Sequence, residues 1–279
     1  SERAYQQALN FCNERVQGVA PGHKEAGPII RHPDVQRMLA NMKSITEAAR
    51  VLTYTACAEV DFTTGDLPTD VLDQHKRRLG LLTPIVKGWC TETAQEVASL
   101  SLQCHGGMGY IEETGIAQIV RDARILPIYE GTNGIQAMDL VVRKIIGDKG
   151  LAINELIADM RKSLSSLLPG SPLLSSQIDR FKGSVDDLEK TVSLLLKHST
   201  NRKFSGSVAF DVLMMTSTIT AAWLMFVSVE RAKLALEGNK VSSEFFDDKV
   251  AIVQYFIDSI LPRYVGHFIT ISSTESVVQ

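Results

Sequence analysis

The sequence lacks the features that define several large classes of protein. Its formal net charge is only −3 at pH 7, and no cluster of lysine and arginine exceeds a few residues. A chain without a basic patch is poorly suited to bind nucleic acid, so we expect no nucleic-acid partner. Proline is scarce, with nine residues among 279, and there is no internal repeat or low-complexity tract. We therefore expect an ordered, globular chain.

Cysteine and histidine are too few and too scattered to build a metal site or a disulfide framework. The four cysteines are Cys12, Cys57, Cys90 and Cys104. None of them belongs to a C-x-x-C pair, and the six histidines show no H-E-x-x-H spacing. Because isolated cysteines are typical of a reducing compartment, we expect free thiols and no metal.

One long uncharged run, residues 212–229, has a length near that of a membrane span. Hydroxyl side chains interrupt it, and Asp211 and Glu230 close its two ends. Its larger apolar residues recur three or four positions apart, at Val212, Met215, Ile219, Trp223 and Phe226. That spacing is typical of one buried helix face. The run predicts a core helix and no membrane span.

Helical periodicity dominates the chain, and no segment alternates as a strand does. The expected helices span residues 2–15, about 33–61, about 72–78, 83–102, 116–122, 133–146, 178–197, 210–236 and 245–261. The pair Thr83-Pro84 predicts a helix start, because threonine caps helices well and proline fits the first helical position. Pro262 is expected to follow the end of the last of these helices. The predicted fold class is all-α.

The helices are expected to form two domains. Residues 163–176 are rich in serine and leucine around Pro169-Gly170-Ser171-Pro172, which is typical of a connector. We therefore predict a helical-bundle domain over residues 1–150 and a second, small helical domain over residues 175–279. The chain begins at Ser1 without an initiator methionine and directly in a helical pattern. On that ground we expect it to be a piece of a longer polypeptide.

Glu130 is the residue whose position suggests catalysis most directly. It lies between Tyr129 and Gly131-Thr132, just before the helix expected from Asn133. A carboxylate beside an aromatic and a flexible glycine can serve as a general base. The alternative is a solvated glutamate that only favours the dipole of the following helix. Spacing alone leaves both interpretations open.

A glycine-rich stretch, Gly106-Gly107-Met108-Gly109, forms a second candidate segment. It follows a predicted helix rather than a strand and lacks the G-x-G-x-x-G spacing, so we exclude a Rossmann dinucleotide fingerprint. A helix end followed by a turn is the structural alternative. Cys104 and His105 just before it are adjacent on a helix and do not face each other, which argues against a thiolate–imidazole pair.

These segments occur in an order that resembles the C-terminal helical domain of the flavin-dependent acyl-CoA dehydrogenases. The matching motifs are Gln103-x-x-Gly106-Gly107, Gly109-Tyr110, Arg121-Asp122, and Ile128-Tyr129-Glu130-Gly131-Thr132 with Ile135-Gln136. The resemblance covers about residues 2–147, and several matches in register are more specific than any one. Residues 178–279 resemble, by position and helical character, the extra C-terminal domain of the larger bacterial members. The family's N-terminal helical domain and β domain would precede Ser1.

The resemblance implies an oxidoreductase that converts an acyl-CoA thioester to the trans-2-enoyl-CoA, with FAD as the flavin cofactor. Glu130 would be the catalytic base, and Gly131 would let the thioester approach the backbone. The implied cofactor-binding residues are Arg15, Gln103, Cys104, His105, Gly106, Gly107, Thr132 and Asn133. Cys104 and His105 would act through their backbone only. The implied partners are an electron-transferring flavoprotein and further copies of the chain in a homodimer or homotetramer, in the bacterial cytoplasm.

Two other functions stay open from the sequence. The first is a non-catalytic helical module for dimerisation or partner binding, in which Glu130 is only a helix-end charge. The second is an acyl-CoA oxidase on the same scaffold, which passes electrons to oxygen. Flavin in the protein separates the enzyme from the module, and peroxide formed during turnover identifies the oxidase.

Overall fold

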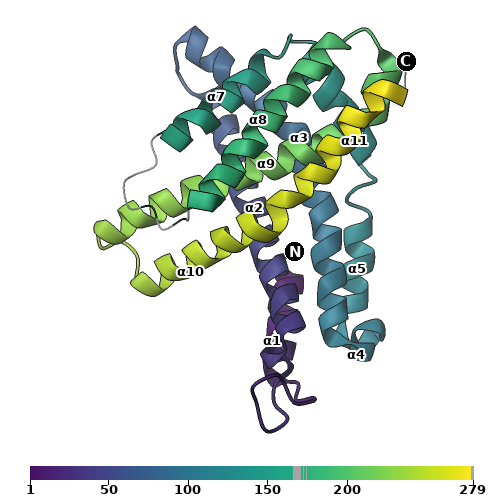
Figure 1. Cartoon of the computed structure of the whole chain (residues 1–279), viewed down its shortest axis with the longest axis vertical. Coiled ribbons are helices and arrows are strands. Elements are labelled where there is room, and N and C mark those ends of the chain that lie inside the picture. The colour runs from purple at the N-terminus through teal and green to yellow at the C-terminus, as the bar shows by residue number, and fades with distance from the viewer. Residues whose placement is uncertain (166–170, 172, 174, 278–279) are drawn as a thin grey trace. The chain divides into compact units, whose positions relative to one another are not determined.

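A computed structural model describes residues 1–165, 171, 173 and 175–277 of the chain. These residues form helices and turns, and the only strand-like pairing among them is one antiparallel bridge between Val16 and Pro28. The predicted all-α fold is confirmed (Figure 1). By their contacts, the residues group into two compact units, 1–47 with 91–129 and 48–90 with 130–279.

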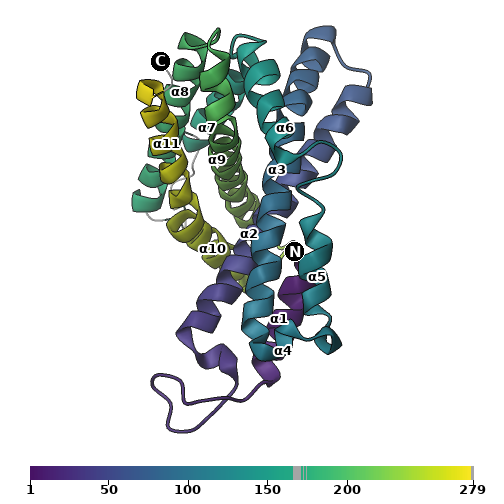
Figure 2. The ribbon, with the colours of Figure 1, turned by 90° about the vertical axis from the view of Figure 1, so that its right-hand side faces the viewer.

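The first unit is a small helical bundle. It contains α1 (Glu2–Glu14), the start of α2 (Pro33–Thr64), the end of α3 (Thr69–His105), the single turn α4 (Gly107–Tyr110) and α5 (Ile116–Arg124). Its core includes the fully buried Ala4, Ala8, Cys12, Met42, Ile45 and Val97. The Ser101 hydroxyl donates to the Ala4 carbonyl at 2.8 Å and fastens α3 to α1. Helix α5 runs beside the last turns of α3 (Figure 2).

The second unit is built around α9 (Arg202–Glu237). Around it lie α6 (Asn133–Met138), α7 (Leu151–Ser165), α8 (Ser175–Lys197), α10 (Ser243–Tyr255) and α11 (Tyr264–Val277). By length and composition α9 could cross a membrane, but 78% of its most apolar stretch is buried inside the fold. Its apolar side chains therefore form a protein core, as the spacing of residues 212–229 predicted.

The predicted helix start at Thr83-Pro84 is wrong, because both residues lie inside the continuous helix α3. An internal proline costs a helix about 3 kcal/mol, since it removes one hydrogen bond and crowds the preceding turn. The buried side chains of Leu81, Leu82 and Ile85 surround it. Each such side chain contributes about 1.5–3 kcal/mol on burial, which is enough to keep the helix intact. The Thr83 hydroxyl donates back to the Leu79 carbonyl at 2.8 Å instead of capping a new helix.

Besides the single turn α4, the helices α7 and α11 were not predicted. Helix α7 begins directly after a glycine turn, where the Asp148 carboxylate accepts from the backbone N–H groups of Gly150 and Ala152, both at 2.9 Å. Helix α11 follows Pro262, which sits in the first turn of a short 3₁₀ segment, Leu261–Arg263. A proline there loses no hydrogen bond, so it does not end the helical path of the chain.

Several predicted boundaries also shift. Helix α2 continues to Thr64, beyond the expected end near residue 61. Helix α9 begins at Arg202 rather than near residue 210, because the Asn201 side chain caps it by accepting from the Phe204 N–H at 3.0 Å. Helices α7 and α8 reach into the predicted connector, of which residues 166–170, 172 and 174 lie outside the described residues.

Candidate active site

Glu130 lies at a sharp bend just before helix α6. Its backbone has φ = 52° and that of Gly131 has φ = 84°, so two consecutive residues are left-handed. A left-handed conformation is free for glycine but costs about 1–2 kcal/mol for a residue with a side chain. A Cβ atom on Gly131 would lie 3.2 Å from Nε2 of Gln136. Glycine therefore relieves both strain and crowding next to Glu130.

Helix α6 begins with two residues that fix the end of this bend. Thr132 is the N-cap, and its hydroxyl oxygen accepts from the Ile135 N–H at 3.3 Å. Asn133 is only 3% exposed, and its Nδ2 donates to the Gly88 carbonyl of α3 at 3.3 Å. The bend is thereby joined to α3 through a buried amide.

Lys87 of α3 is a member of this arrangement that the sequence analysis missed. Its Nζ donates to the Gly131 carbonyl at 2.7 Å and to Oδ1 of Asn133 at 2.8 Å. The feature of the sequence that could have pointed to Lys87 is its place as the one charged residue in the stretch 79–91. Long cationic side chains in such stretches usually reach a specific acceptor.

The Glu130 side chain, in contrast, is exposed. Within the described part of the chain, its carboxylate has no hydrogen bond or ion pair. Gly131 and Asn133, in contrast, are hydrogen-bonded to α3. Strained backbone at φ = 52° together with a free carboxylate is typical of a functional position. The arrangement presents an unpaired carboxylate on a bend that is hydrogen-bonded to α3.

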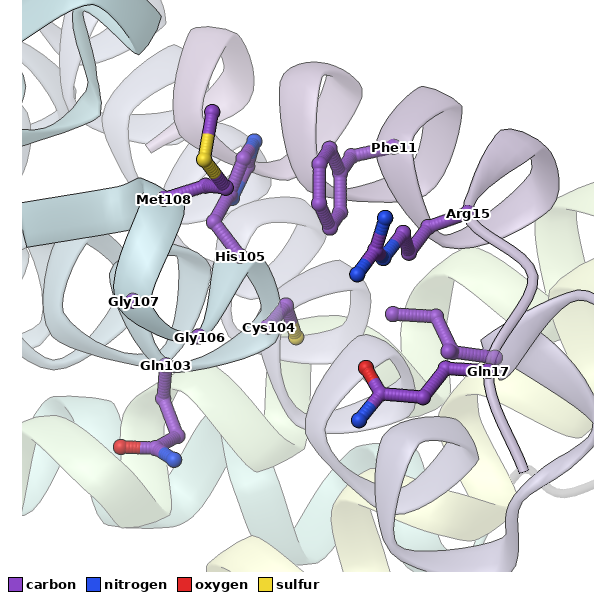
Figure 3. Close-up of a pocket in the computed structure, with 10 residues that line it drawn as sticks. Phe11, Arg15, Gln17, Gln103, Cys104, His105, Gly106, Gly107 and Met108 are labelled. Atoms are coloured by element: carbon purple, nitrogen blue, oxygen red, sulfur yellow. The ribbon is translucent and has the colours of Figure 1, made fainter.

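A separate hollow of about 370 Å³ lies within the first unit (Figure 3). It is lined by Phe11, Arg15, Gln17, Ile29, and residues 103–108. Six predicted cofactor residues, Arg15 and 103–107, therefore line one pocket. Figure 3 shows the Arg15 guanidinium directed into the hollow, while the Gln103 side chain points away from Arg15. Arg15 has no ion pair within the described residues, which leaves its charge available for an anion.

The glycines beside this hollow have different roles. Gly106 has φ = 57°, and no heavy atom lies within 4 Å of a Cβ placed on Gly106 or Gly107. Their backbone therefore faces open space that a ligand could use. At Gly109, a Cβ would lie 2.4 Å from the Leu102 carbonyl oxygen. Gly109 is thus required for the close return of the chain against the end of α3.

Cys104 and His105 are held by the fold and are nearly buried, at 5% and 7% exposure. The His105 ring stacks on Phe11 with centroids 4.4 Å apart, and its Nδ1 lies 2.7 Å from the Ser101 carbonyl, which requires Nδ1 to be the donor. The hydrogen bond with Cys12, together with burial, raises the pKa of the Cys104 thiol. A protonated thiol is a poor nucleophile, so Cys104 is not suited to covalent catalysis.

The Arg121-Asp122 motif contributes a surface contact rather than a pocket residue. Arg121 donates to both carboxylate oxygens of Glu112, at 3.0 and 2.9 Å. This bidentate pair lowers the pKa of Glu112 and ties α5 to the turn that precedes it. Among the described residues there is no group of three or more potential metal ligands.

Two family models cover most of the chain. Residues 1–145, more than half of the sequence, match the C-terminal domain of acyl-CoA dehydrogenases. Residues 152–279 match a domain described as acetyl-CoA dehydrogenase C-terminal like. The chain therefore belongs to the acyl-CoA dehydrogenase family.

Curated relatives agree with this assignment. The chain is 39% identical over 272 residues to 3-methylmercaptopropionyl-CoA dehydrogenase of Ruegeria pomeroyi, covering 94% of this chain and 45% of that protein. It is 29% identical over 290 residues to a broad-specificity linear acyl-CoA dehydrogenase of Mycobacterium tuberculosis, covering 99% of this chain and 46% of that protein. The chain thus spans about half the length of these relatives.

Solved structures show the same fold. An acyl-CoA dehydrogenase of Bacillus anthracis, complexed with FAD, aligns with a TM-score of 0.72 at 19% identity, covering 99% of this chain and 48% of that one. The Caenorhabditis elegans protein ACDH-11, in complex with C11-CoA, aligns with a TM-score of 0.67 at 20% identity, covering 91% of this chain and 40% of that one. At these identities the likeness establishes the fold alone.

Proposed function

We propose that the chain carries the catalytic base of an enzyme that dehydrogenates an acyl-CoA thioester to the trans-2-enoyl-CoA. The observation that supports this most directly is the free carboxylate of Glu130, whose backbone is left-handed with φ = 52°. The bend is fixed to α3 by the hydrogen bond from Lys87 to the Gly131 carbonyl. Lys149 and Asn239 also have positive φ, so the conformation supports the proposal only in combination with the free, exposed carboxylate of Glu130. Membership of the family makes the acyl-CoA thioester the expected substrate class.

In this proposal Glu130 removes the α-proton of the thioester. The proton passes to the carboxylate, which becomes a neutral carboxylic acid, as a hydride leaves the β-carbon. When bound, FAD supplies the acceptor for that hydride. A positioned general base contributes about 10²–10⁴-fold to the rate, provided that it lies within hydrogen-bond reach of the proton. The hydrogen-bonded backbone of Gly131 would supply that placement, and because Gly131 has no side chain the thioester can approach the backbone.

The residues of the hollow fit an anionic portion of the cofactor. Arg15 offers an unpaired guanidinium, which suits a phosphate, and Gly106 and Gly107 leave open space for close backbone approach. Cys104 and His105 would contribute backbone groups only, since their side chains are buried. We propose that these residues and Gln103 contact FAD.

At the start of α6 the proposed cofactor contacts need a refinement. The Thr132 hydroxyl accepts from Ile135, and its own O–H is a further donor that can reach a ligand. The Asn133 side chain already bonds to Lys87 and Gly88. Asn133 would therefore approach the cofactor through its backbone, with its side chain serving the fold.

The remaining partners follow from the proposed reaction. Electrons taken from the acyl-CoA must leave the flavin, so we propose an electron-transferring flavoprotein as acceptor and a homodimer or homotetramer as the working assembly. The oxidase and the non-catalytic module are the competing outcomes.

The test is the visible spectrum of the protein as produced from its gene, recorded anaerobically before and after a panel of acyl-CoAs is added. We expect a flavin band that bleaches with at least one acyl-CoA and returns when electron-transferring flavoprotein is supplied. Reoxidation by air with stoichiometric peroxide would identify an oxidase. A protein that stays colourless after incubation with FAD would contradict the proposed enzyme and favour the helical module.

A further inference from the structure

Lys87 links α3 to the bend that carries Glu130. It is the only charged residue in the stretch 79–91, where Leu81, Leu82 and Ile85 are fully or almost fully buried. The side chain is itself only partly exposed. Taking an ammonium group out of water is costly unless it finds strong acceptors. Lys87 finds two, the Gly131 carbonyl at 2.7 Å and Oδ1 of Asn133 at 2.8 Å.

Both acceptors lie directly after the strained part of the backbone, Glu130 and Gly131. The Gly131 carbonyl belongs to the peptide group between Gly131 and Thr132, so a contact that fixes it also fixes the end of the left-handed bend. Such angles persist only when surrounding contacts over-determine them. A charge-assisted hydrogen bond is stronger than a neutral one and fixes the carbonyl in one orientation.

The Asn133 side chain makes a second connection between the start of α6 and α3. Its Oδ1 accepts from Lys87, and its Nδ2 donates to the carbonyl of Gly88, the next residue of α3. Two adjacent residues of α3, Lys87 and Gly88, thus hydrogen-bond to the oxygen and the nitrogen of the Asn133 side-chain amide. Rotation of that amide would break both contacts, so the start of α6 has one permitted register against α3.

We propose that Lys87 is a positioning residue for Glu130, acting through the Gly131 carbonyl and the Asn133 amide. This inference rests on the proposed function of Glu130 as base. Lys87 does not contact the substrate; it holds the backbone from which the Glu130 carboxylate projects. A misplacement of about 1 Å in a catalytic group can lower a rate about a hundredfold.

The experiment compares Lys87→Met, Lys87→Gln and Lys87→Arg in the flavin-loaded protein as produced from its gene. Lys76→Met is the matched control, because it removes a lysine from the same helix whose side chain is 56% exposed. For each variant, stopped-flow spectroscopy measures the limiting rate of flavin reduction by acyl-CoA, and titration measures the acyl-CoA Kd. Hydrogen exchange measures the protection of backbone amides at residues 131–136.

We expect Lys87→Met to lower the limiting rate about ten- to a hundredfold with little change in Kd. Amide protection should fall at residues 131–136 and stay unchanged elsewhere. Lys87→Arg should recover part of both losses, because its guanidinium can still donate to two acceptors, and Lys76→Met should match the wild type. If Lys87→Met does not fold, the limiting rate and the amide protection of Lys87→Gln are compared with those of Lys87→Arg instead.

Unchanged protection at residues 131–136 in Lys87→Met, or a limiting rate within twofold of wild type, would overturn the positioning role. So would a loss of protection spread evenly over the chain, which would mark a purely structural lysine. Glu130→Gln, measured in parallel, separates this outcome from failure of the proposed function. If Glu130→Gln reduces flavin normally, the base assignment fails, whereas hydrogen exchange still decides whether Lys87 holds the bend.

Discussion

At the scale of single residues, the predicted site residues fall into two groups: those whose side chains are hydrogen-bonded inside the fold and those whose charged groups are available to a ligand. Asn133 and His105 are buried and hydrogen-bonded inside the fold. Arg15 and Glu130 are exposed, with no ion pair among the described residues, so their charges remain available. The first unit therefore offers an available cation at Arg15, and the second unit, taken by itself, offers an available carboxylate at Glu130.

The glycines of the motif should respond differently to substitution. We predict that Gly109→Ala destabilises the protein by about 1–3 kcal/mol, because the new methyl would meet a backbone carbonyl 2.4 Å away that has little freedom to move. Gly107→Ala is the matched control, since its Cβ would enter open space. Urea unfolding of both variants checks this. Equal free energies of unfolding for the two variants would show that Gly109 is not needed for packing.

Single residues also mark the limit of what the sequence could predict. The motif order identified Glu130 and the glycines as a group, but motif letters alone do not separate Gly109, which is crowded, from Gly107, which is open. Lys87 lies 43 positions before Glu130 and belongs to no local pattern with it. Its role depends on which helix face α6 contacts, and that is a tertiary property.

At the scale of secondary-structure elements, α11 is attached to α8 by a small ion cluster. Glu275 of α11 accepts from Nζ of Lys197 at 2.7 Å and lies 2.8 Å from Nε2 of His198. Lys197 chiefly, and His198 next, lower the pKa of Glu275. These contacts tie the end of the chain to the core helices of the second unit.

This cluster predicts a pH dependence of stability. Because the folded state lowers the pKa of Glu275, the carboxylate contributes stability above its unfolded pKa, about 4.3, and loses it as pH falls through the folded value. Glu275→Gln should therefore lower Tm at pH 7, and the difference should vanish at a pH below both values. Thermal unfolding at a series of pH values measures this, with Glu25→Gln in an exposed loop as control. A Tm difference that is constant down to acid pH would contradict the assignment.

The elements were predicted well where the apolar period is unbroken, as in α1 and in the part of α9 from residue 210 to its end. Prediction failed at Pro84 and Pro262, where proline was treated as a boundary. In α3, burial of the neighbouring leucines outweighs the lost hydrogen bond, and after Ile260 the proline falls in a first turn that needs no donor. Local propensity was overridden by packing that the sequence does not display.

At the scale of the whole molecule, the four cysteines differ in how far the fold buries their thiols. Cys12 and Cys104 are buried, Cys90 is partly buried, and Cys57 is exposed. Burial raises the pKa of Cys90 to about 11. The thiolate is the reactive form, so a buried thiol with a raised pKa reacts slowly.

We predict that a thiol reagent at pH 8 modifies the native protein rapidly at Cys57 and much more slowly at Cys90. Cys12 and Cys104 should react mainly on unfolding, because both are buried and burial contributes to the raised pKa of Cys104. Peptide mass mapping after timed labelling identifies the modified positions, and Cys57→Ser serves as the control that removes the fast phase. Rapid labelling of Cys104 in the folded protein would contradict the described burial.

The fold class and the family could be inferred from the sequence because several motifs lie in fixed order along about 145 residues. The contact-based grouping, 1–47 with 91–129 and 48–90 with 130–279, was not foreseen, since α2 and α3 each contribute to both units. The division at residues 1–150 and 175–279 remains a prediction. The chain spans about half of its relatives' length, and its substrate remains a proposal.

The central claim is that Glu130 is the base that removes the α-proton. The most direct measurement is anaerobic stopped-flow reduction of the flavin by acyl-CoA in wild type and in Glu130→Gln, with Glu113→Gln, another exposed glutamate, as control. We predict that Glu130→Gln binds acyl-CoA and FAD but reduces the flavin at least about a hundredfold more slowly, whereas Glu113→Gln matches the wild type. Flavin reduction by Glu130→Gln at the wild-type rate would contradict the account.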